Sequence, residues 1–225
     1  MITASKFICP DGLISKALNN QLTDQRVSLN EPTGDFFYDP WIIKEEYKNT
    51  VWEQILNSLD TPVGEARIIK LDSGKSYYAH ADIDDRWHLN LSGEYSYLID
   101  LDNNKMFELV NDNIWYYMNA GLLHSASNFG SVPRNQLVVR KLLEHSTDPN
   151  MISITIKPAV DKFDIRYQFD KMISPWLNQQ NKKKNIDNFK NVENTVTLKI
   201  ASNLKDELLK LADGLFIVEE HESNL

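Results

Sequence analysis

The stretch of sequence that decides the fold spans residues 86–109 and reads RWHLNLSGEYSYLIDLDNNKMFEL. Apolar and polar residues alternate in its first part, which is typical of a strand with two different faces. Asp102-Asn103-Asn104 separates two apolar runs and is a hairpin signal, because such residues readily adopt turn conformations. We therefore expect antiparallel strands on either side of this turn.

Short apolar runs of the same kind fill the chain from Val63 to Leu143, interrupted by Gly, Asn, Asp and Ser. The runs cover residues 66–71, 77–78, 87–91, 95–99, 105–110, 114–118, 122–126 and 137–143. Many short strands with no helical pattern between them predict an antiparallel sandwich or barrel. The expected fold is mainly β with flanking helices, built on a double-stranded β-helix (jelly-roll, cupin-like) core.

The regions on either side of this block have different patterns. Residues 41–59 show a helical spacing of apolar residues, and Thr61-Pro62 ends it. Beyond Glu144 we expect a small α/β appendage, with strands at residues 152–156, 195–201 and 215–218 and a helix capped by Asn203 and stopped by Gly214. Residues 162–177 fit a strand or a helix, and residues 179–194 resemble a loop. The expected domains are residues 1–145 and residues 146–225.

Composition excludes several classes of partner. The 225 residues carry a net charge of -8, so no global basic field attracts nucleic acid or an anionic membrane. Cys9 is the only cysteine, which rules out an intrachain disulfide. We see no signal peptide and no apolar stretch long enough to span a bilayer, and we therefore expect a cytoplasmic protein.

Histidines and carboxylates within the strand-rich block suggest a metal site. His80-Ala81-Asp82 places an imidazole and a carboxylate two residues apart, and an extended segment projects both to one face. His124 is the best candidate for a third ligand. Two histidines and one carboxylate leave three positions open on an octahedral metal, as iron(II) oxygenases require. The alternative is a surface loop, since Asp84 and Asp85 follow at once.

Two arginine-containing segments suggest an anion site. In residues 86–91 the polar side chains share one face, which lies in water in an ordinary sheet but lines the interior of a barrel that encloses an anion. Arg134 follows His124 by ten residues and could grip a carboxylate with its guanidinium fork. Arg140 has the same strand parity and is the rival, and Arg134 taken alone could instead be a surface residue.

Together these motifs resemble the aspartyl/asparaginyl β-hydroxylase family of 2-oxoglutarate oxygenases, which includes the bacterial cis-proline hydroxylases. The family pattern is H-x-D or H-x-G, then R-x-H, then H-S-A followed by P-R and a short aliphatic run. This chain supplies His80-Ala81-Asp82, Arg86-Trp87-His88, His124-Ser125-Ala126 and Pro133-Arg134 followed by residues 135–139. The matching motifs lie within about 60 residues, and the likeness extends weakly over residues 66–143.

The resemblance implies the roles of six residues. His80, Asp82 and His124 would bind Fe(II), Arg134 would pair with the distal carboxylate of 2-oxoglutarate, and Arg86 and His88 would help to hold this co-substrate. The implied enzyme is an Fe(II)- and 2-oxoglutarate-dependent dioxygenase that hydroxylates a C–H bond of an amino acid, free or within a peptide or protein.

The match also has departures. The aspartyl hydroxylase branch carries glycine where Asp82 stands, Arg86 follows His80 more closely than in the family, and residues 146–225 match nothing in it. One alternative is a cupin-like metal-binding isomerase or small-molecule binding module without oxygenase activity, which would not need Arg134. Another is a scaffold that keeps only the fold.

Overall fold

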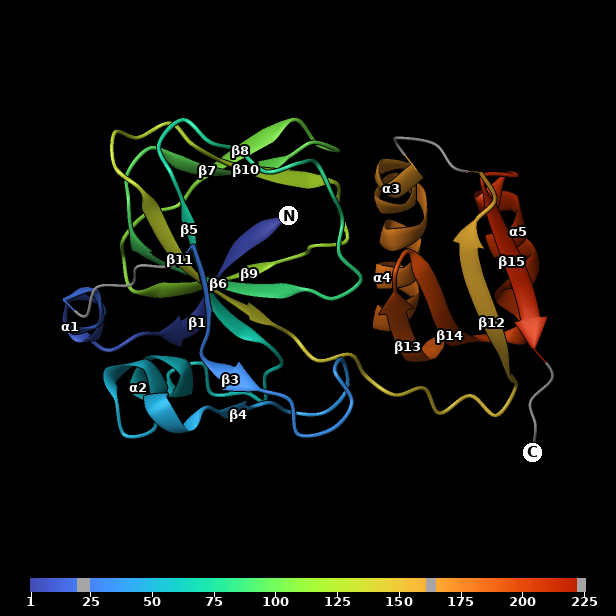
Figure 1. Cartoon of the computed structure of the whole chain (residues 1–225), viewed down its shortest axis with the longest axis horizontal. Helices are drawn as coiled ribbons and strands as arrows, with labels where there is room; N and C mark the ends of the chain where they lie inside the picture. Colours follow the sequence, from blue (N-terminus) through green and yellow to red (C-terminus); the bar gives the residue numbers. More distant parts are fainter. Residues whose placement is uncertain (20–24, 161–164, 222–225) are drawn as a thin grey trace. The chain divides into compact units, whose positions relative to one another are not determined.

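The computed structural model of the chain describes residues 1–19, 25–160 and 165–221. These residues are mainly β and form several antiparallel sheets, as the sequence predicts. The chain divides into two compact units, Met1–Ala79 with Asp84–Leu142, and His80–Ile83 with Leu143–Leu225 (Figure 1). No helix among the described residues is long and apolar enough to cross a membrane.

The first unit contains three sheets. The largest has the order β1 (Ile2–Ile8), β9 (Ile114–Met118), β6 (Arg86–Ser92), β11 (Arg134–Arg140), β5 (Ala66–Leu71) and β2 (Arg26–Ser28). A second has the order β10 (His124–Asn128), β7 (Ser96–Asp100) and β8 (Lys105–Glu108). A two-stranded ladder joins β3 (Asn30–Glu31) to β4 (Ile42–Ile43), and the helices are α1 (Leu13–Leu18), the short η1 (Glu45–Tyr47) and α2 (Val51–Asn57).

The two faces of the six-stranded sheet have opposite character. One face contributes Leu89, Leu137 and Val139 to an apolar core that also contains Trp52 and Ile55 of α2. The other face is buried too, although it carries the polar side chains of β6 and β11. The interior alternative for the polar side chains of residues 86–91 is therefore confirmed, because Arg86, His88 and Asn90 are all buried.

The hairpin predicted from Asp102-Asn103-Asn104 is present. β7 and β8 pair antiparallel with Asp100 opposite Lys105, and Asn104 has a φ of 51°, a conformation that asparagine tolerates. The Asp100 carboxylate accepts a hydrogen bond from the backbone N–H of Asn103 at 3.1 Å. The turn is thus fixed by the side-chain chemistry that the sequence displays.

The helix expected over residues 41–59 is wrong in its first half. Ile42–Ile43 form β4 and pair with β3, and only Val51–Asn57 is α-helical. Thr50 starts this helix, because its side-chain oxygen accepts a hydrogen bond from the N–H of Trp52 at 3.2 Å. Pairing with β3 decided the conformation of residues 42–43, although the spacing of apolar residues in this segment fits a helix. Residues 77–78 likewise form no strand of their own in this unit.

The second unit carries a four-stranded antiparallel sheet with helices. The strand order is β13 (Ile186–Val192), β14 (Thr195–Ala201), β12 (Met151–Pro158) and β15 (Phe216–His221). The helical segments are α3 (Ile165–Gln168), the π-helix η2 (Phe169–Ile173), α4 (Ser174–Lys182), the short η3 (Ser202–Leu204) and α5 (Lys205–Ala212). The ambiguous residues 162–177 are helical from Ile165 onward, and residues 162–164 lie outside the described residues.

Two expectations for this unit are wrong. Residues 179–194 are not a loop, because α4 continues to Lys182 and strand β13 follows it. In β13, Ile186 and Phe189 are buried, whereas the polar side chains between and after them face outward. Asn203 does not cap α5, because it lies within η3 and the helix starts after Leu204 without a side-chain cap. A short 3-10 turn satisfies the start of this helix instead.

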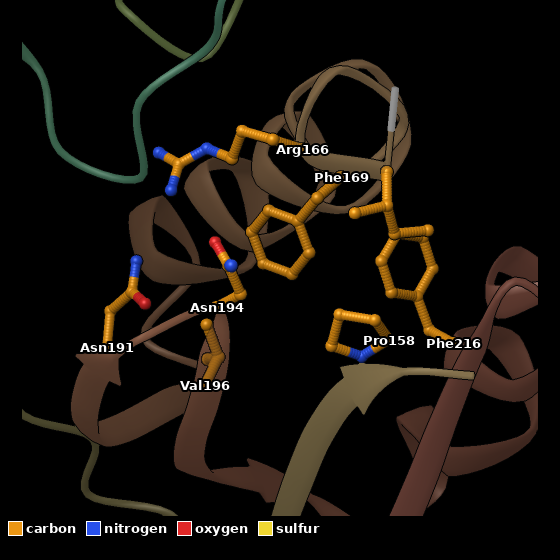
Figure 2. Close-up of a pocket in the computed structure, with 8 residues that line it drawn as sticks. Pro158, Arg166, Phe169, Asn191, Asn194, Val196 and Phe216 are labelled. Carbon is orange, nitrogen blue, oxygen red and sulfur yellow. The ribbon is translucent and has the colours of Figure 1, made fainter. Parts of the chain in front are cut away.

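A small apolar hollow lies between the helices and the sheet of the second unit. Figure 2 shows Phe169 and Phe216 on its walls, with Pro158 and Val196 on the strands beneath. The two phenylalanine rings meet edge to face with centroids 5.6 Å apart. Its volume of about 10 Å³ accommodates no more than a water molecule, so the hollow is a packing feature of this unit.

Candidate metal centre

His124 begins strand β10 and is held in one orientation. It pairs opposite Asp100 of β7, and its side chain is buried. Its Nδ1 lies 2.7 Å from the carbonyl oxygen of Leu122, so Nδ1–H donates and Nε2 keeps its lone pair. Histidines that bind metals are commonly oriented by a hydrogen bond of this kind. His124 is therefore held in an orientation in which Nε2 could bind a metal ion.

The chain segment that leads to His80 runs along β10. The N–H of Gly74 donates to the carbonyl of Asn128 at 2.9 Å, and the N–H of Tyr77 donates to the carbonyl of Ala126 at 2.9 Å. Ser76 forms an antiparallel bridge with Ser127. Continuing this register by a few residues brings His80 to the end of β10 where His124 lies. Long-range pairing, and not sequence spacing, thus brings the two histidines together.

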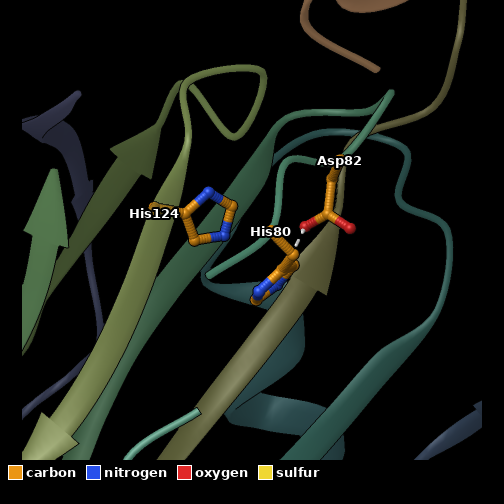
Figure 3. A group of neighbouring side chains, drawn as sticks. All are labelled: His80, Asp82 and His124. Carbon is orange, nitrogen blue, oxygen red and sulfur yellow. Dashed lines mark ion pairs between the residues drawn. The ribbon is translucent and has the colours of Figure 1, made fainter. Parts of the chain in front are cut away.

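His80, Asp82 and His124 form a group that could hold a metal ion. Each offers one ligand atom, and these atoms all lie within 4.8 Å of one another (Figure 3). Nε2 of His80 is 3.9 Å from Oδ2 of Asp82. Adjacent donors on a metal bound at about 2.1 Å stand about 3 Å apart, so metal binding would require these atoms to approach by roughly 1 to 2 Å.

A hydrogen bond from helix α4 holds the backbone immediately after Asp82. His80–Ile83 continues directly from Ala79 and into Asp84, which belong to the first unit. Asn178 of α4, which belongs to the same unit as His80–Ile83, donates its Nδ2 to the carbonyl of Ile83 at 3.0 Å. The carboxylate of Asp82 therefore projects from a short, tethered segment.

The neighbouring acids Asp84 and Asp85 have other partners. Asp84 is buried and pairs with Arg86, and its Oδ2 lies 3.0 Å from Nε of Arg140. Asp85 is also buried and accepts a hydrogen bond from the hydroxyl of Tyr117. Both carboxylates serve the packing of the first unit, which leaves Asp82 as the acid that accompanies the two histidines.

Arg134 is a buried cation without an acidic partner. Its side chain is on the polar inner face of β11 and is 1% exposed. Within the described part of the chain it forms no ion pair, and its Nε and Nη1 atoms have no hydrogen-bond partner. Burial holds the pKa of Arg134 below its usual range. An arginine buried in this way is costly unless an anion pairs with it.

A glycine permits the close approach that buries Arg134. Gly93 has a φ of 112°, and a Cβ at this position would lie 3.0 Å from the Cα of Arg134. The register between β6 and β11 also shifts between Asn135 and Gln136. Such an irregularity re-aims side chains at the end of a ladder. Gly93 was visible in the sequence, but its proximity to Arg134 was not.

His88 is buried on the inner face of β6, close enough to Arg134 and His124 for their charges to affect its pKa. Its pKa is lowered to about 3, mainly by burial and further by the nearby charges of Arg134, His124 and Arg86, so the imidazole is neutral near pH 7. Gln136 lies beside it and Asn90 is its neighbour on the same face of β6. Gln136 Nε2 and Asn90 Oδ1 have no hydrogen-bond partner among the described residues. This interior therefore offers several polar atoms to a ligand.

Sequence reasoning missed two residues of this interior. Gln136 has the same strand parity as Arg134, and this pattern could have placed it on the inner face from the sequence alone. Tyr77, which lies close enough to Arg134 to affect its pKa, had no sequence signal beyond its apolar run.

Arg86 and Arg140 differ from Arg134, because their charges are balanced by acids. Both pair with Asp84, and Nη2 of Arg140 is 3.8 Å from Oε2 of Glu65. The Arg140 guanidinium also stacks over the rings of Phe36 and Phe37 at 4.4 and 4.7 Å from their centroids. Arg140 is therefore part of a structural network, and a role of Arg86 in holding a ligand stays a prediction.

Comparison with known proteins gives distant structural neighbours only. No protein-family model matches the chain, and no curated protein matches it. AviO1 from Streptomyces viridochromogenes Tue57 is 10% identical, with a TM-score of 0.40 over 66% of this chain and 90% of that one. A cupin superfamily protein from Desulfitobacterium hafniense DCB-2 is 12% identical, with a TM-score of 0.34 over 62% of this chain and 98% of that one.

A third neighbour is a sugar phosphate isomerase from a cupin superfamily of Silicibacter pomeroyi DSS-3. It is 14% identical, with a TM-score of 0.29 over 43% of this chain and 64% of that one. At these values the neighbours assign no activity, which must be inferred from the side chains of the site.

Proposed function

We propose that this protein is an Fe(II)- and 2-oxoglutarate-dependent dioxygenase that hydroxylates a C–H bond of an amino acid, free or within a peptide or protein. In this proposal the first unit is a double-stranded β-helix of the aspartyl/asparaginyl β-hydroxylase kind. The motifs from His80 to residue 139 support it, and so does the His80–Asp82–His124 group. The proposed substrate is a small molecule, peptide or protein, and neither nucleic acid nor a membrane is an expected partner.

The observation that carries the proposal is the unpaired charge of Arg134. The sheet buries this guanidinium on its inner face, and no carboxylate among the described residues neutralises it. His88 is close enough to both Arg134 and His124 for each to affect its pKa, which places all three in one interior. A dicarboxylate that reaches a metal with one end and Arg134 with the other would satisfy both groups.

The residues present fit the metal and the co-substrate. His80 and His124 would supply nitrogen ligands and Asp82 an oxygen ligand, leaving three positions for other ligands. The hydrogen bond to the Leu122 carbonyl keeps Nδ1 of His124 protonated, so Nε2 would be the nitrogen that binds the metal. Arg134 would fix the distal carboxylate, and neutral His88 would lie along the co-substrate without adding charge. Bound iron would supply the oxidative decarboxylation of 2-oxoglutarate that is coupled to hydroxylation.

Anaerobic titration with Fe(II) and then 2-oxoglutarate tests this proposal directly. We expect one Fe(II) per chain and binding of 2-oxoglutarate to the loaded protein. A succinate assay against a panel of free amino acids and peptides should then reveal stimulated turnover. Tight metal binding with no binding of 2-oxoglutarate would contradict the proposal and favour the cupin-like isomerase or binding module.

A further inference from the structure

The segment that carries His80 and Asp82 lies outside the strands of the fold. Ala81 and Ile83 are buried, whereas the side chains of His80 and Asp82 are 36% and 27% exposed. Buried and half-exposed residues thus alternate, which keeps both candidate ligands on one side of the segment. Because the segment is not part of a sheet, its backbone carbonyls must find partners other than a neighbouring strand.

Asn178 of α4 supplies such a partner. Its Nδ2 donates to the carbonyl of Ile83 at 3.0 Å and lies 3.4 Å from the carbonyl oxygen of Asp82. An amide nitrogen carries two hydrogens, so one side chain can serve both carbonyls. Asn178 is 3% exposed and belongs to the same compact unit as His80–Ile83. One buried side chain therefore holds the backbone at Asp82 and at the residue that follows it.

Asn178 belongs to a buried polar row on an otherwise apolar helical face. Asp170, Ser174 and Asn178 follow one another at intervals of four residues, and all three are buried. Ile173 and Leu177, which precede Ser174 and Asn178, are fully buried apolar residues. A buried amide costs free energy unless its polar atoms find partners. The two carbonyls of the Asp82 segment meet this requirement for the Nδ2 group of Asn178.

We propose that Asn178 is a positioning residue for the metal centre: by holding the backbone at Asp82, it sets the direction from which the Asp82 carboxylate approaches the ion. This inference rests on the metal site of the proposed function and gives residues 146–225 a part in it. The ligand atoms must approach one another by roughly 1 to 2 Å on binding. A held backbone restricts Asp82 to the positions that rotation of its side chain can reach. Asn178 thus keeps the ion within the range of the carboxylate.

Co(II) titration of the full-length protein tests the inference with two matched variants, Asn178→Leu and Gln180→Met. Each replaces a buried amide of α4 with an apolar side chain of similar size. Gln180 is 2% exposed and accepts a hydrogen bond from Nδ2 of Asn185 at 2.9 Å, so its loss affects the turn after the helix. Groups that orient metal ligands typically change metal affinity at least tenfold, and we expect roughly tenfold weaker Co(II) binding by Asn178→Leu. Gln180→Met should bind Co(II) as the wild type does.

The visible spectrum of bound Co(II) separates positioning from packing, because it reports the ligands on the ion. At saturating Co(II), the spectrum of Asn178→Leu should resemble that of Asp82→Ala, since both lack the carboxylate at the ion. A wild-type affinity or a wild-type spectrum in Asn178→Leu would overturn the inference, and so would an equal loss of affinity in Gln180→Met. If Asn178→Leu does not fold, Asn178→Ser replaces it, because the shorter hydroxyl side chain cannot span the same distance to the two carbonyls.

The test is independent of 2-oxoglutarate, so its failure is distinguishable from failure of the proposed function. If Co(II) binding depends on Asn178 but the loaded protein does not bind 2-oxoglutarate, the inference stands and the proposed function is overturned. If 2-oxoglutarate binds and Asn178→Leu holds Co(II) as the wild type does, only the inference is overturned. A wild type that binds no metal ion would overturn both.

Discussion

Arg140 and Arg134 lie on the same face of strand β11, yet only Arg140 has an acid to pair with. Nε of Arg140 lies 3.0 Å from Oδ2 of Asp84, while Arg134 has no carboxylate partner within the described residues. The two arginines are equivalent by strand parity and differ by their surroundings. Arg140 therefore belongs to a salt-bridge network of the sheet, whereas Arg134 is the residue that we propose binds an anion.

Replacing these arginines should separate the two purposes. A bidentate, charge-assisted pair with a carboxylate contributes on the order of 2 to 3 kcal/mol, so Arg134→Ala should weaken 2-oxoglutarate binding roughly 30-fold or more. Arg140→Ala should leave this binding nearly unchanged and instead lower the free energy of unfolding, because it removes a partner of Asp84 and Glu65. Calorimetry and urea denaturation measure the two effects, and the opposite ranking of affinities would assign the carboxylate to Arg140.

Metal binding should depend on both histidines of the group. His80→Ala and His124→Ala each remove one of three protein ligands, and we expect both to lose stoichiometric Fe(II) binding while circular dichroism shows a retained fold. His145→Ala is the control, since this exposed histidine pairs with Asp187 and lies in the second unit. An unchanged iron content in both ligand variants would refute the assignment.

The acids that follow His80 should behave differently from one another. Asp82→Gly removes a charged ligand, and we expect it to lose most 2-oxoglutarate turnover, measured as uncoupled succinate formation, while retaining weak metal binding. Asp84→Ala should instead destabilise the protein by about 3 kcal/mol, because it leaves Arg86 and Arg140 buried without their shared carboxylate. Normal turnover in Asp82→Gly, with turnover lost in folded Asp84→Ala or Asp85→Ala, would move the ligand to a neighbouring acid.

The buried imidazole of His88 should make stability depend on pH. Its pKa is lowered to about 3 in the folded protein, whereas an unfolded histidine titrates near 6.5. Between these values the unfolded chain binds a proton that the folded chain does not, so the free energy of unfolding should fall as the pH falls. The slope from this residue is at most about 1.4 kcal/mol per pH unit.

Urea denaturation of the metal-free protein between pH 7.5 and pH 5 measures this dependence. His88→Asn removes the titrating group and should show a shallower loss of stability than the wild type over that range. Equal slopes would mean that His88 becomes protonated in the folded protein.

Local sequence was sufficient for elements defined by short-range chemistry. Strand β5 and the β7–β8 hairpin follow directly from alternation and from the Asp102-Asn103-Asn104 turn. Local sequence failed where pairing with another strand decides the conformation. Ile42–Ile43 became a strand because β3 pairs with it, and β13 formed in a polar segment because it pairs with β14. Spacing within one segment contains no information about such partners.

For the candidate site, the sequence by itself determined the kinds of side chain available: two histidines, a carboxylate and two arginines of the same parity on one expected strand. Only the tertiary structure decided that His80 and Asp82 lie beside His124, that Asp84 pairs with Arg140, and that Arg134 has no acidic partner among the described residues. The physical reason is that the role of a charged side chain depends on the groups that folding places within a few ångströms of it. Those neighbours come from strands far apart in the sequence.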